Sequence, residues 1–180
     1  ALAAARGTRE AFAPYGELVS PTRDGFAFAP GAGDASLELD KGVPRFYIMS
    51  LPAERGLGFD RITYHDKVTQ CIAAVDPRRE WYLAVAPPDA ERPSLEELKV
   101  FAFKGGTIVK LHKGTWHAGP LYAPPDVSGC PVDGADGGVA FYNLELADTN
   151  VTDHTNWEFA KEDGLSFTVT PPAEEAGGDA

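Results

Sequence analysis

Short runs of β-branched and aromatic residues recur along most of the chain, and Gly, Pro or Asp separates almost every run from the next. Such runs are typical of short strands, and the residues between them are typical of turns. The pattern predicts strands near Arg45–Leu51, Phe59–Tyr64, Thr69–Val75, Trp81–Ala86, Val100–Phe103, Thr107–His112, Trp116–Leu121, Val139–Leu146 and Leu165–Val169. Many short strands without a repeat of fixed period indicate an all-β sandwich or closed barrel.

Helical signals are few. One helix is predicted over about Thr8–Tyr15, where a proline and a glycine mark its end. A second, short helix is predicted after Ser94, because Ser94 and Glu97 have the spacing of a capping box. It must be short, since the run from Val100 already has the composition of a strand.

Three segments are rich in Gly, Pro, Ala or acidic residues and are expected to be weakly ordered: residues 24–44, residues 123–138 and the tail from Pro171. The chain of 180 residues has the length of one domain. We therefore expect a single barrel domain over residues 1–170, followed by a disordered tail over residues 171–180.

The balance of charge and hydropathy excludes two classes of partner. The formal net charge is -11 at pH 7, and a charge of that sign repels phosphate backbones, so no nucleic-acid partner is expected. The sequence has no run of about 18 apolar residues, so no membrane insertion is expected.

Cysteine content bears on the compartment. Two cysteines in a chain of 180 residues do not form a disulfide framework, so an intracellular, reducing compartment, cytoplasmic or organellar, is expected. The sequence begins at Ala1 and not at Met, and either removal of a targeting peptide or trimming of the chain accounts for this.

Two of the four histidines lie in the segment KLHKGTWH, which ends at His117. Its pattern is strand, glycine turn, strand, and Gly114 allows the chain to reverse there. His112 and His117 should then flank one turn. Before the turn, Lys110 and His112 share a strand face. In the later strand Phe141–Leu146, the residues Phe141, Asn143 and Glu145 also share a face.

Two interpretations of these polar faces remain open. A barrel interior contains Lys, His, Asn and Glu only where they line a polar cavity. Alternatively, the polar faces are simply solvated. His65 lies at a predicted strand end, with Gln70 at the start of the next strand, and a third histidine beside a strand turn strengthens the cavity interpretation. Imidazole ligands suit nickel, zinc, iron or copper, and manganese where oxygen donors are added.

The histidine motifs resemble those of cupins. The second cupin motif has the form P-x-G-x-x-H, and HKGTWH resembles it with His112 at the proline position and His117 at the metal-binding position. The first cupin motif has two histidines and then a glutamate. Here His65 stands at the second histidine position and Gln70 at the glutamate position, a variant that is similar to the ureidoglycolate lyase family.

Further segments are similar to plant and algal members of that family. They are, by first residue, EAFAPYGE (Glu10), PRFYIMS (Pro44), FDRITYH (Phe59), VTQC (Val68), WYLAVA (Trp81), KGTWHAGP (Lys113) and FYNLELADTNVTDH (Phe141). The resemblance runs from about Ala11 to Val169. It implies a cupin-type jelly-roll β-barrel, a homodimer, a divalent metal ion such as nickel, manganese or zinc, and cleavage of ureidoglycolate to glyoxylate and urea in purine and allantoin breakdown.

The chain departs from the bacterial members at two places. They have two adjacent histidines after the Trp, whereas Ala118 follows His117 here. They also have an Asp-Arg pair in the late strand, whereas Glu145 and Leu146 stand here. The lost arginine matters because its forked guanidinium binds a carboxylate well. Lys110 or Lys113 could replace it only as a point charge.

The resemblance implies roles for named residues. His65, Gln70 and His117 would hold the metal, which would bind the carboxylate and hydroxyl of the substrate. Glu145 or His112 would accept the hydroxyl proton. The remaining roles are substrate binding by Lys110, Lys113 and Asn143, packing by Trp116, and a structural role for His154. Glu145 could instead simply pair with Lys110 or Arg45.

Three functions are compatible with the sequence. The first is a metal-dependent C–N lyase acting on ureidoglycolate. The second is a cupin that binds a small metabolite, or acts as an accessory subunit, without this catalysis. The third is a cupin isomerase or dioxygenase, which the incomplete first motif disfavours.

Overall fold

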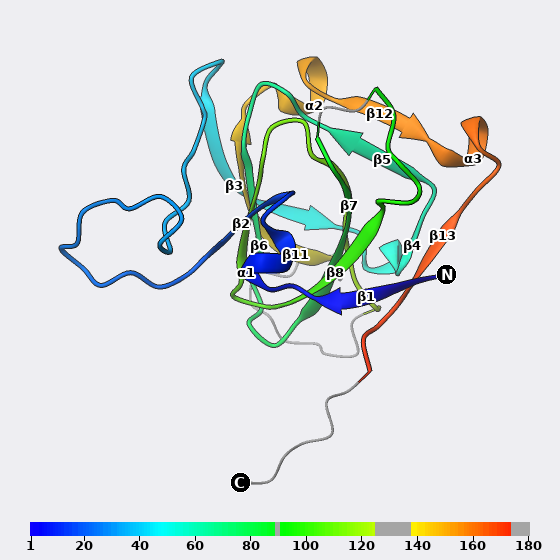
Figure 1. Ribbon diagram of the computed structural model, residues 1–180, viewed down its shortest axis with the longest axis horizontal. Helices are drawn as coiled ribbons and strands as arrows, with labels where there is room; N and C mark the ends of the chain where they lie inside the picture. The colour runs from blue at the N-terminus through cyan, green and yellow to red at the C-terminus, as the bar shows by residue number, and fades with distance from the viewer. Residues whose placement is uncertain (89–90, 125–137, 174–180) are drawn as a thin grey trace, which may run out of the picture.

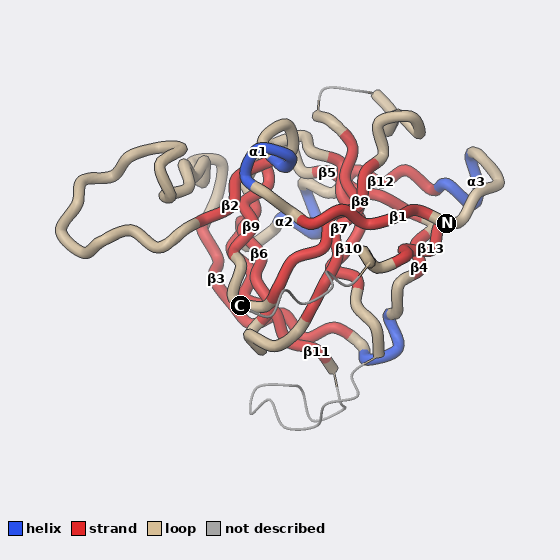
Figure 2. The backbone as a smooth tube through the Cα atoms, turned by 60° about the horizontal axis from the view of Figure 1, so that its bottom comes forward, coloured by secondary structure: helices blue, strands red, loops and turns tan. Residues whose placement is uncertain are grey.

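The computed structural model of the chain describes residues 1–88, 91–124 and 138–173, and it is built mainly from two curled β-sheets (Figures 1 and 2). The eight-stranded sheet has the order β12-β5-β10-β7-β8-β1-β13-β4, and the five-stranded sheet has the order β2-β9-β6-β11-β3. The sheets curl around a common interior and form a half-barrel, which confirms the predicted all-β, cupin-type barrel.

The strands of the larger sheet are β1 (Leu2–Arg6), β4 (Gly58–Phe59), β5 (Arg61–Tyr64), β7 (Glu80–Ala86), β8 (Lys99–Lys104), β10 (Trp116–Leu121), β12 (Thr155–Glu158) and β13 (Phe167–Thr170). Those of the smaller sheet are β2 (Gly16–Val19), β3 (Pro44–Leu51), β6 (Gln70–Ala74), β9 (Ile108–Leu111) and β11 (Val139–Leu146). Each predicted strand overlaps an observed one, although the run predicted over Phe59–Tyr64 is divided between β4 and β5.

Three observed strands were not predicted: β1, β2 and β12. Strand β1 has the sequence LAAAR, and alanine has little intrinsic preference for strands. It is a strand because it pairs in parallel with both β8 and β13. Tertiary pairing has therefore overridden local preference.

The helices are single turns. Helix α1 (Arg9–Phe12) lies within the predicted helix, and the Thr8 hydroxyl accepts a hydrogen bond from the Ala11 amide at 3.2 Å. The helix predicted after Ser94 is wrong, because residues 95–97 form a turn that leads directly into β8. The remaining helical turns are η1 (Ala53–Arg55), α2 (Thr149–Thr152) and α3 (Phe159–Glu162). No helix in the described ranges is long and apolar enough to cross a membrane.

The two faces of the larger sheet belong to different apolar clusters. On β7, Trp81 and Leu83 point into the space between the sheets, where aromatic rings including Phe12 and Phe141 surround them. The alternate residue Tyr82 belongs to a second cluster on the other face of the sheet. Trp116 is buried in that second cluster, as its predicted packing role requires.

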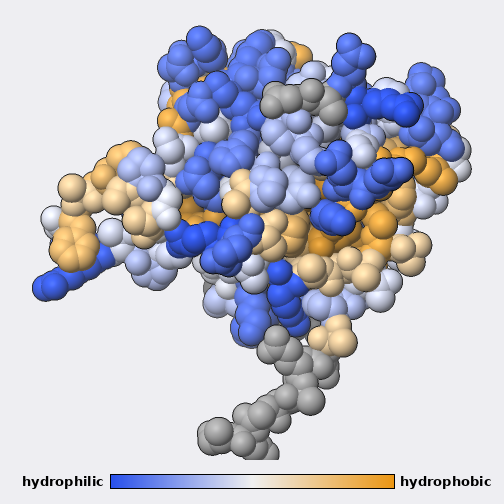
Figure 3. Space-filling model, viewed as in Figure 1, coloured by the Kyte–Doolittle hydropathy of each residue, from blue (hydrophilic) through white to orange (hydrophobic). Residues whose placement is uncertain are grey.

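Between β2 and β3 the chain leaves the body as an arm of residues 20–43, at the left of Figure 1. Apart from a single bridge between Pro30 and Asp34, the arm has no strand or helix, in line with the weak order predicted for residues 24–44. Its surface is partly apolar, as Figure 3 shows, since Phe26 and Phe28 are 67% and 61% exposed. Most of the predicted loop 123–138 and of the predicted tail lies outside the described residues.

Candidate active site

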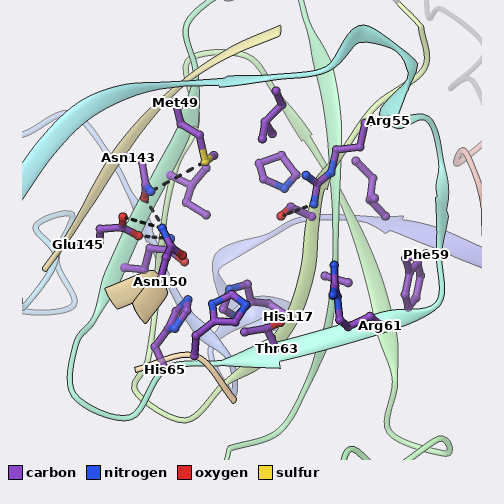
Figure 4. A pocket seen from close by; sticks show the side chains of 18 of the residues that line it. Met49, Arg55, Phe59, Arg61, Thr63, His65, His117, Asn143, Glu145 and Asn150 are labelled. Carbon is purple, nitrogen blue, oxygen red and sulfur yellow. Dashed lines mark hydrogen bonds between the residues drawn. The ribbon is translucent and has the colours of Figure 1, made fainter. Parts of the chain in front are cut away.

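A cavity of about 440 Å³ lies between the two sheets, at the end of the half-barrel that the aromatic cluster leaves open (Figure 4). Both sheets and the segment that contains α2 contribute to its wall. Its polar lining residues are Tyr47, Arg55, Asp60, Arg61, Thr63, His65, Gln70, His117, Asn143, Glu145, Asn150 and His154. Five of these are residues to which the sequence assigned a role in the site: His65, Gln70, His117, Asn143 and Glu145.

Local pairing brings His65 and His117 together. Gly114 has a φ of 78°, as the predicted glycine turn requires, and its amide donates to the backbone oxygen of His65 at 2.7 Å. On the next strand, His117 pairs in register with Thr63 of β5. The centroids of the two imidazole rings are consequently 5.1 Å apart.

Backbone carbonyls set the tautomers of both histidines. The Nδ1 atom of His117 lies 3.0 Å from the Thr115 oxygen, and Nδ1 of His65 bonds to the Asp153 oxygen. A carbonyl oxygen only accepts, so each Nδ1 carries the proton and each Nε2 keeps its lone pair. Burial, and then the neighbouring His65, lower the pKa of His117 to about 3. Both features suit a metal-binding imidazole.

Asp153 also fixes the backbone around His65. Its carboxylate accepts from the amides of Asp66 at 2.9 Å and Lys67 at 3.0 Å. The strand end that carries His65 is therefore bound by a segment almost ninety residues further along the chain. This contact orients the imidazole toward the cavity.

An amide and carboxylate network forms the neighbouring wall. Glu145 is 1% exposed, and its carboxylate accepts from the Tyr47 hydroxyl at 3.1 Å, from Gln70 Nε2 at 3.1 Å and from Asn150 Nδ2 at 3.4 Å. Gln70 Nε2 also donates to Asn143 Oδ1 at 3.1 Å. Glu145 forms no ion pair with Lys110 or with Arg45, although Arg45 is its backbone partner on β3.

This network determines the orientation of the Gln70 amide. Because Nε2 is used by two acceptors, Oε1 is left as a buried atom for which the described residues provide no hydrogen-bond partner. A buried oxygen without a partner is costly unless a ligand or ion binds it. Together with Nε2 of His65 and of His117, this oxygen makes a donor set that fits a divalent ion. In the described part of the chain, no group of three His, Cys, Asp or Glu side chains does so.

The structure does not bring His112, Lys110 or Lys113 to the cavity. Val109 and Leu111 are the residues of β9 that point inward, so Lys110 points outward, where it pairs with Glu17 at 2.7 Å and bonds to His112 Nδ1 at 3.0 Å. The polar face of β9 is thus outside the barrel, so the substrate-binding role predicted for Lys110 and the proton-accepting role predicted for His112 have no support from their positions. Lys113 forms an ion pair with Glu38.

His154 lies in the cavity wall, although the sequence did not assign it to the site. The sequence indicated a structural residue, but His154 lines the cavity, with its ring centroid 5.4 Å from that of His65. Strand β12 pairs with β5, and this pairing sets the preceding residue, His154, opposite His65. Burial, and then the charges of His65 and Arg61, lower the pKa of His154.

Six other polar cavity residues were not predicted: Tyr47, Arg55, Asp60, Arg61, Thr63 and Asn150. Exposure alternates along β3 and places Tyr47 on the inner face, but the sequence alone held no signal for this, because the outward residues Phe46 and Ile48 are also apolar. Arg61 begins β5 and shares a strand face with Thr63 and His65, so the segment FDRITYH held a signal for it. Arg55 lies in η1, and no sequence motif connects it with the histidines.

Two curled sheets that enclose paired histidines and a polar cavity define a cupin-type barrel. The model of the ureidoglycolate lyase family matches residues 1–127, well over half of the chain, and the chain belongs to that family. A search among curated proteins found no match. The matched range includes His65, Gln70 and His117, whereas Asn143, Glu145 and His154 lie beyond it.

Proposed function

We propose that the chain is a metal-dependent lyase that cleaves ureidoglycolate into glyoxylate and urea. Membership of the ureidoglycolate lyase family supports a ureidoglycolate-processing function. The observation that carries the metal-dependent reaction is the convergence of two proton-free imidazole nitrogens and the unpartnered Gln70 oxygen on one cavity. A cavity of about 440 Å³ also has room for a small hydroxy acid together with an ion.

His65, His117 and Gln70 would hold the divalent ion, with nickel, manganese and zinc as candidates. When bound, such an ion supplies Lewis-acid chemistry that lowers the pKa of a substrate hydroxyl. The chain itself keeps this donor set in place. The oxygens of Thr115 and Asp153 fix the imidazoles, while Asn143 and Glu145 fix the amide.

The reaction requires one proton to move from oxygen to nitrogen. Glu145 accepts the hydroxyl proton, the C–N bond breaks as the hydroxyl oxygen forms a carbonyl, and the bond's electron pair goes to the urea nitrogen. The proton then passes to that nitrogen, which completes urea and leaves glyoxylate. The Tyr47 phenol stays neutral beside Glu145 and does not compete as a base. Burial, and with it the Glu145 carboxylate, raise the pKa of this phenol.

The same network favours a second candidate, a cupin that binds a small metabolite without catalysis. Both oxygens of Glu145 already accept hydrogen bonds from three side chains, an arrangement that also suits a static polar wall. Turnover distinguishes the two candidates, since both require the cavity and only the lyase requires a mobile proton.

The test is glyoxylate release from ureidoglycolate by protein loaded with nickel, manganese or zinc, with metal content measured in parallel. Wild type should release glyoxylate, and His117→Ala should lose metal and turnover together. His112→Gln is the matched control, because His112 lies outside the cavity, and it should keep both. If wild type shows no release above the uncatalysed rate with any of the three ions, the lyase is refuted and the binding cupin takes its place.

We also propose that two copies of the chain form a homodimer through the outer face of the five-stranded sheet. Phe46, Ile48 and Tyr142 are 69%, 46% and 41% exposed there, and the rings of Phe46 and Tyr142 stack at 6.0 Å. Phe28 and Leu37 of the arm line the same apolar groove, which has a volume of about 420 Å³. Large exposed apolar patches are typical of interaction surfaces.

A further inference from the structure

Two arginines form the cavity wall opposite the carboxylate network. Arg55 ends η1, and Arg61 begins β5. In Figure 4 their side chains extend toward each other on one side of the cavity, while Glu145 lies on the other side. Two cations therefore lie opposite Glu145, with Asp60 as a further acid in the lining next to Arg61 in the sequence, although the chain as a whole carries a net charge of -11.

The positive charge of Arg55 is not balanced by a protein carboxylate. Its one hydrogen bond within the described residues runs from Nη2 to the backbone oxygen of Gly119 at 3.3 Å, and no ion pair joins it to a described acid. A guanidinium has five N–H donors, so most of those of Arg55 remain available. Its charged neighbour is Arg61, a second cation.

Arg61 is only partly neutralised. Its Nη1 atom lies 3.4 Å from Glu158, in an ion pair whose two side chains are 57% and 43% exposed. Exposed pairs of this kind are weak and are screened by salt. Burial, and then the charge of Arg61, lower the pKa of Arg55. A guanidinium nevertheless stays protonated at physiological pH. Two adjacent cations at a cavity wall attract an anion.

We infer that Arg55, supported by Arg61, is the carboxylate-binding site of the cavity and that its ligands are small 2-hydroxy and 2-oxo acids. The identity of the acid as ureidoglycolate depends on the proposed function, whereas the anion site itself does not. A forked guanidinium bonds both oxygens of a carboxylate, which no lysine can do. Arg55 therefore takes the role that the sequence analysis gave to Lys110 or Lys113.

This placement also orients the substrate. With the carboxylate held at Arg55, the adjacent carbon, its hydroxyl and its ureido group extend toward Glu145 on the opposite wall and toward the histidines, which lie between Arg61 and Glu145 in Figure 4. Glyoxylate retains the carboxylate, so it should bind at the same wall as a product inhibitor. Urea lacks a carboxylate and should leave without competing for Arg55.

The experiment measures binding of glycolate and of its neutral amide, glycolamide, to the full chain by calorimetry. Wild type should prefer glycolate, and Arg55→Gln should weaken glycolate binding about 10–100-fold while leaving glycolamide unchanged. Arg55→Lys should give an intermediate loss, because it keeps the charge and loses the fork. Arg92→Gln removes an exposed positive charge outside the cavity and should change neither ligand.

Three results would overturn the inference: wild type that binds no glycolate, a folded Arg55→Gln protein with unchanged glycolate affinity, or equal weakening of glycolate and glycolamide. Circular dichroism checks that each variant is folded. Binding is read without turnover, so the two proposals can fail separately. Glycolate binding through Arg55 in a protein that releases no glyoxylate refutes the lyase alone, whereas glyoxylate release with a KM unaffected by Arg55→Gln refutes the carboxylate site alone.

Discussion

The inner and outer faces of the five-stranded sheet differ in polarity, and on β11 the polar side chains point inward. On β11, the inward residues Asn143 and Glu145 are both 1% exposed, whereas the outward residue Tyr142 is 41% exposed. A sheet with one solvated face commonly has apolar residues inside and polar residues outside. Here one end of the inner face is polar, and the outer face is apolar around β3 and β11.

The difference between the two faces shows that polar side chains can be buried when other side chains hydrogen-bond to them, whereas apolar side chains can stay exposed at the surface. Each inward polar group of β11 is hydrogen-bonded to another side chain, which removes most of the cost of burying it. The outward aromatic side chains of Phe46 and Tyr142 stack on each other and remain partly exposed beside the arm. Among the described residues, the polar groups of the inner face are thus hydrogen-bonded except at Gln70 Oε1, whereas the aromatic side chains of the outer face stay exposed.

The largest expected effect comes from Glu145→Gln on the inner face. If Glu145 is the proton acceptor, the variant should keep its metal and lose about 10²–10⁴-fold in rate, measured as glyoxylate release. If Glu145 only orients the Gln70 amide, metal affinity should fall as well, because a glutamine competes as a donor. Glu54→Gln, at an exposed position, is the charge-matched control and should change neither quantity.

Substitutions at two adjacent residues of β11 compare how much each face contributes to the free energy of unfolding. Phe141 is fully buried, so Phe141→Ala should lower the free energy of unfolding by about 3–5 kcal/mol. Tyr142→Ala, one residue away, should cost less than about 1 kcal/mol in dilute monomer. Urea denaturation of both variants measures the contrast, and equal losses would show that the outer face is as well packed as the inner one.

A charge on the outer face should weaken the proposed homodimer. Phe46→Glu places a carboxylate in the apolar patch, and the dimer dissociation constant should rise at least about tenfold. Light scattering coupled to gel filtration at several concentrations gives this constant. Phe26→Glu is the control at an exposed aromatic of the arm that does not line the groove. A wild type that stays monomeric at high concentration would contradict the proposal.

The smallest effect concerns the outward ion pair of Lys110 and Glu17. Burial opposes the charged carboxylate, but the hydrogen bond and charge of Lys110 outweigh it and lower the pKa of Glu17 below its usual 4.5. A lowered folded pKa stabilises the protein above the unfolded value, and this contribution is lost as the pH falls through the folded one.

Glu17→Gln should therefore be about 1 kcal/mol less stable than wild type at pH 7, and this gap should close as an acid titration carries the pH from the usual 4.5 down through the lowered folded pKa of Glu17. Denaturant unfolding at pH 7 and along this titration measures the gap. Glyoxylate release should be unchanged, because the pair lies outside the cavity. A gap that does not depend on pH would contradict the role given to the ion pair.

Sequence patterns sufficed for ten of the thirteen strands that the structure describes and for the grouping of His65, Gln70 and His117, because strand turns and the cupin-like motifs are local. They did not suffice for the direction of β9. Val109, Lys110 and Leu111 are all buried, so alternation alone does not distinguish the inner face from the outer one. Lys110 is buried through an ion pair with β2, a strand that the sequence did not predict.

Arg55 and His154 could not be predicted for a different reason. Each reaches the cavity through contacts between segments distant in the chain, such as the pairing of β12 with β5. An arginine in a turn has the same local pattern whether it faces solvent or a cavity. The histidine motifs correctly indicated His65 and His117, but they gave no information on the rest of the cavity lining.

The bond between His65 and the Asp153 backbone bears on how the protein is made. A nascent chain that ends at residue 127 already holds both imidazoles of the donor set, yet it lacks the carbonyl that orients one of them and the acids and amides of β11 that orient Gln70. The donor set is therefore completed only after about residue 153 has left the ribosome. If the chain holds the proposed metal, a partly synthesised chain should bind it weakly, and loading should follow the folding of the whole barrel.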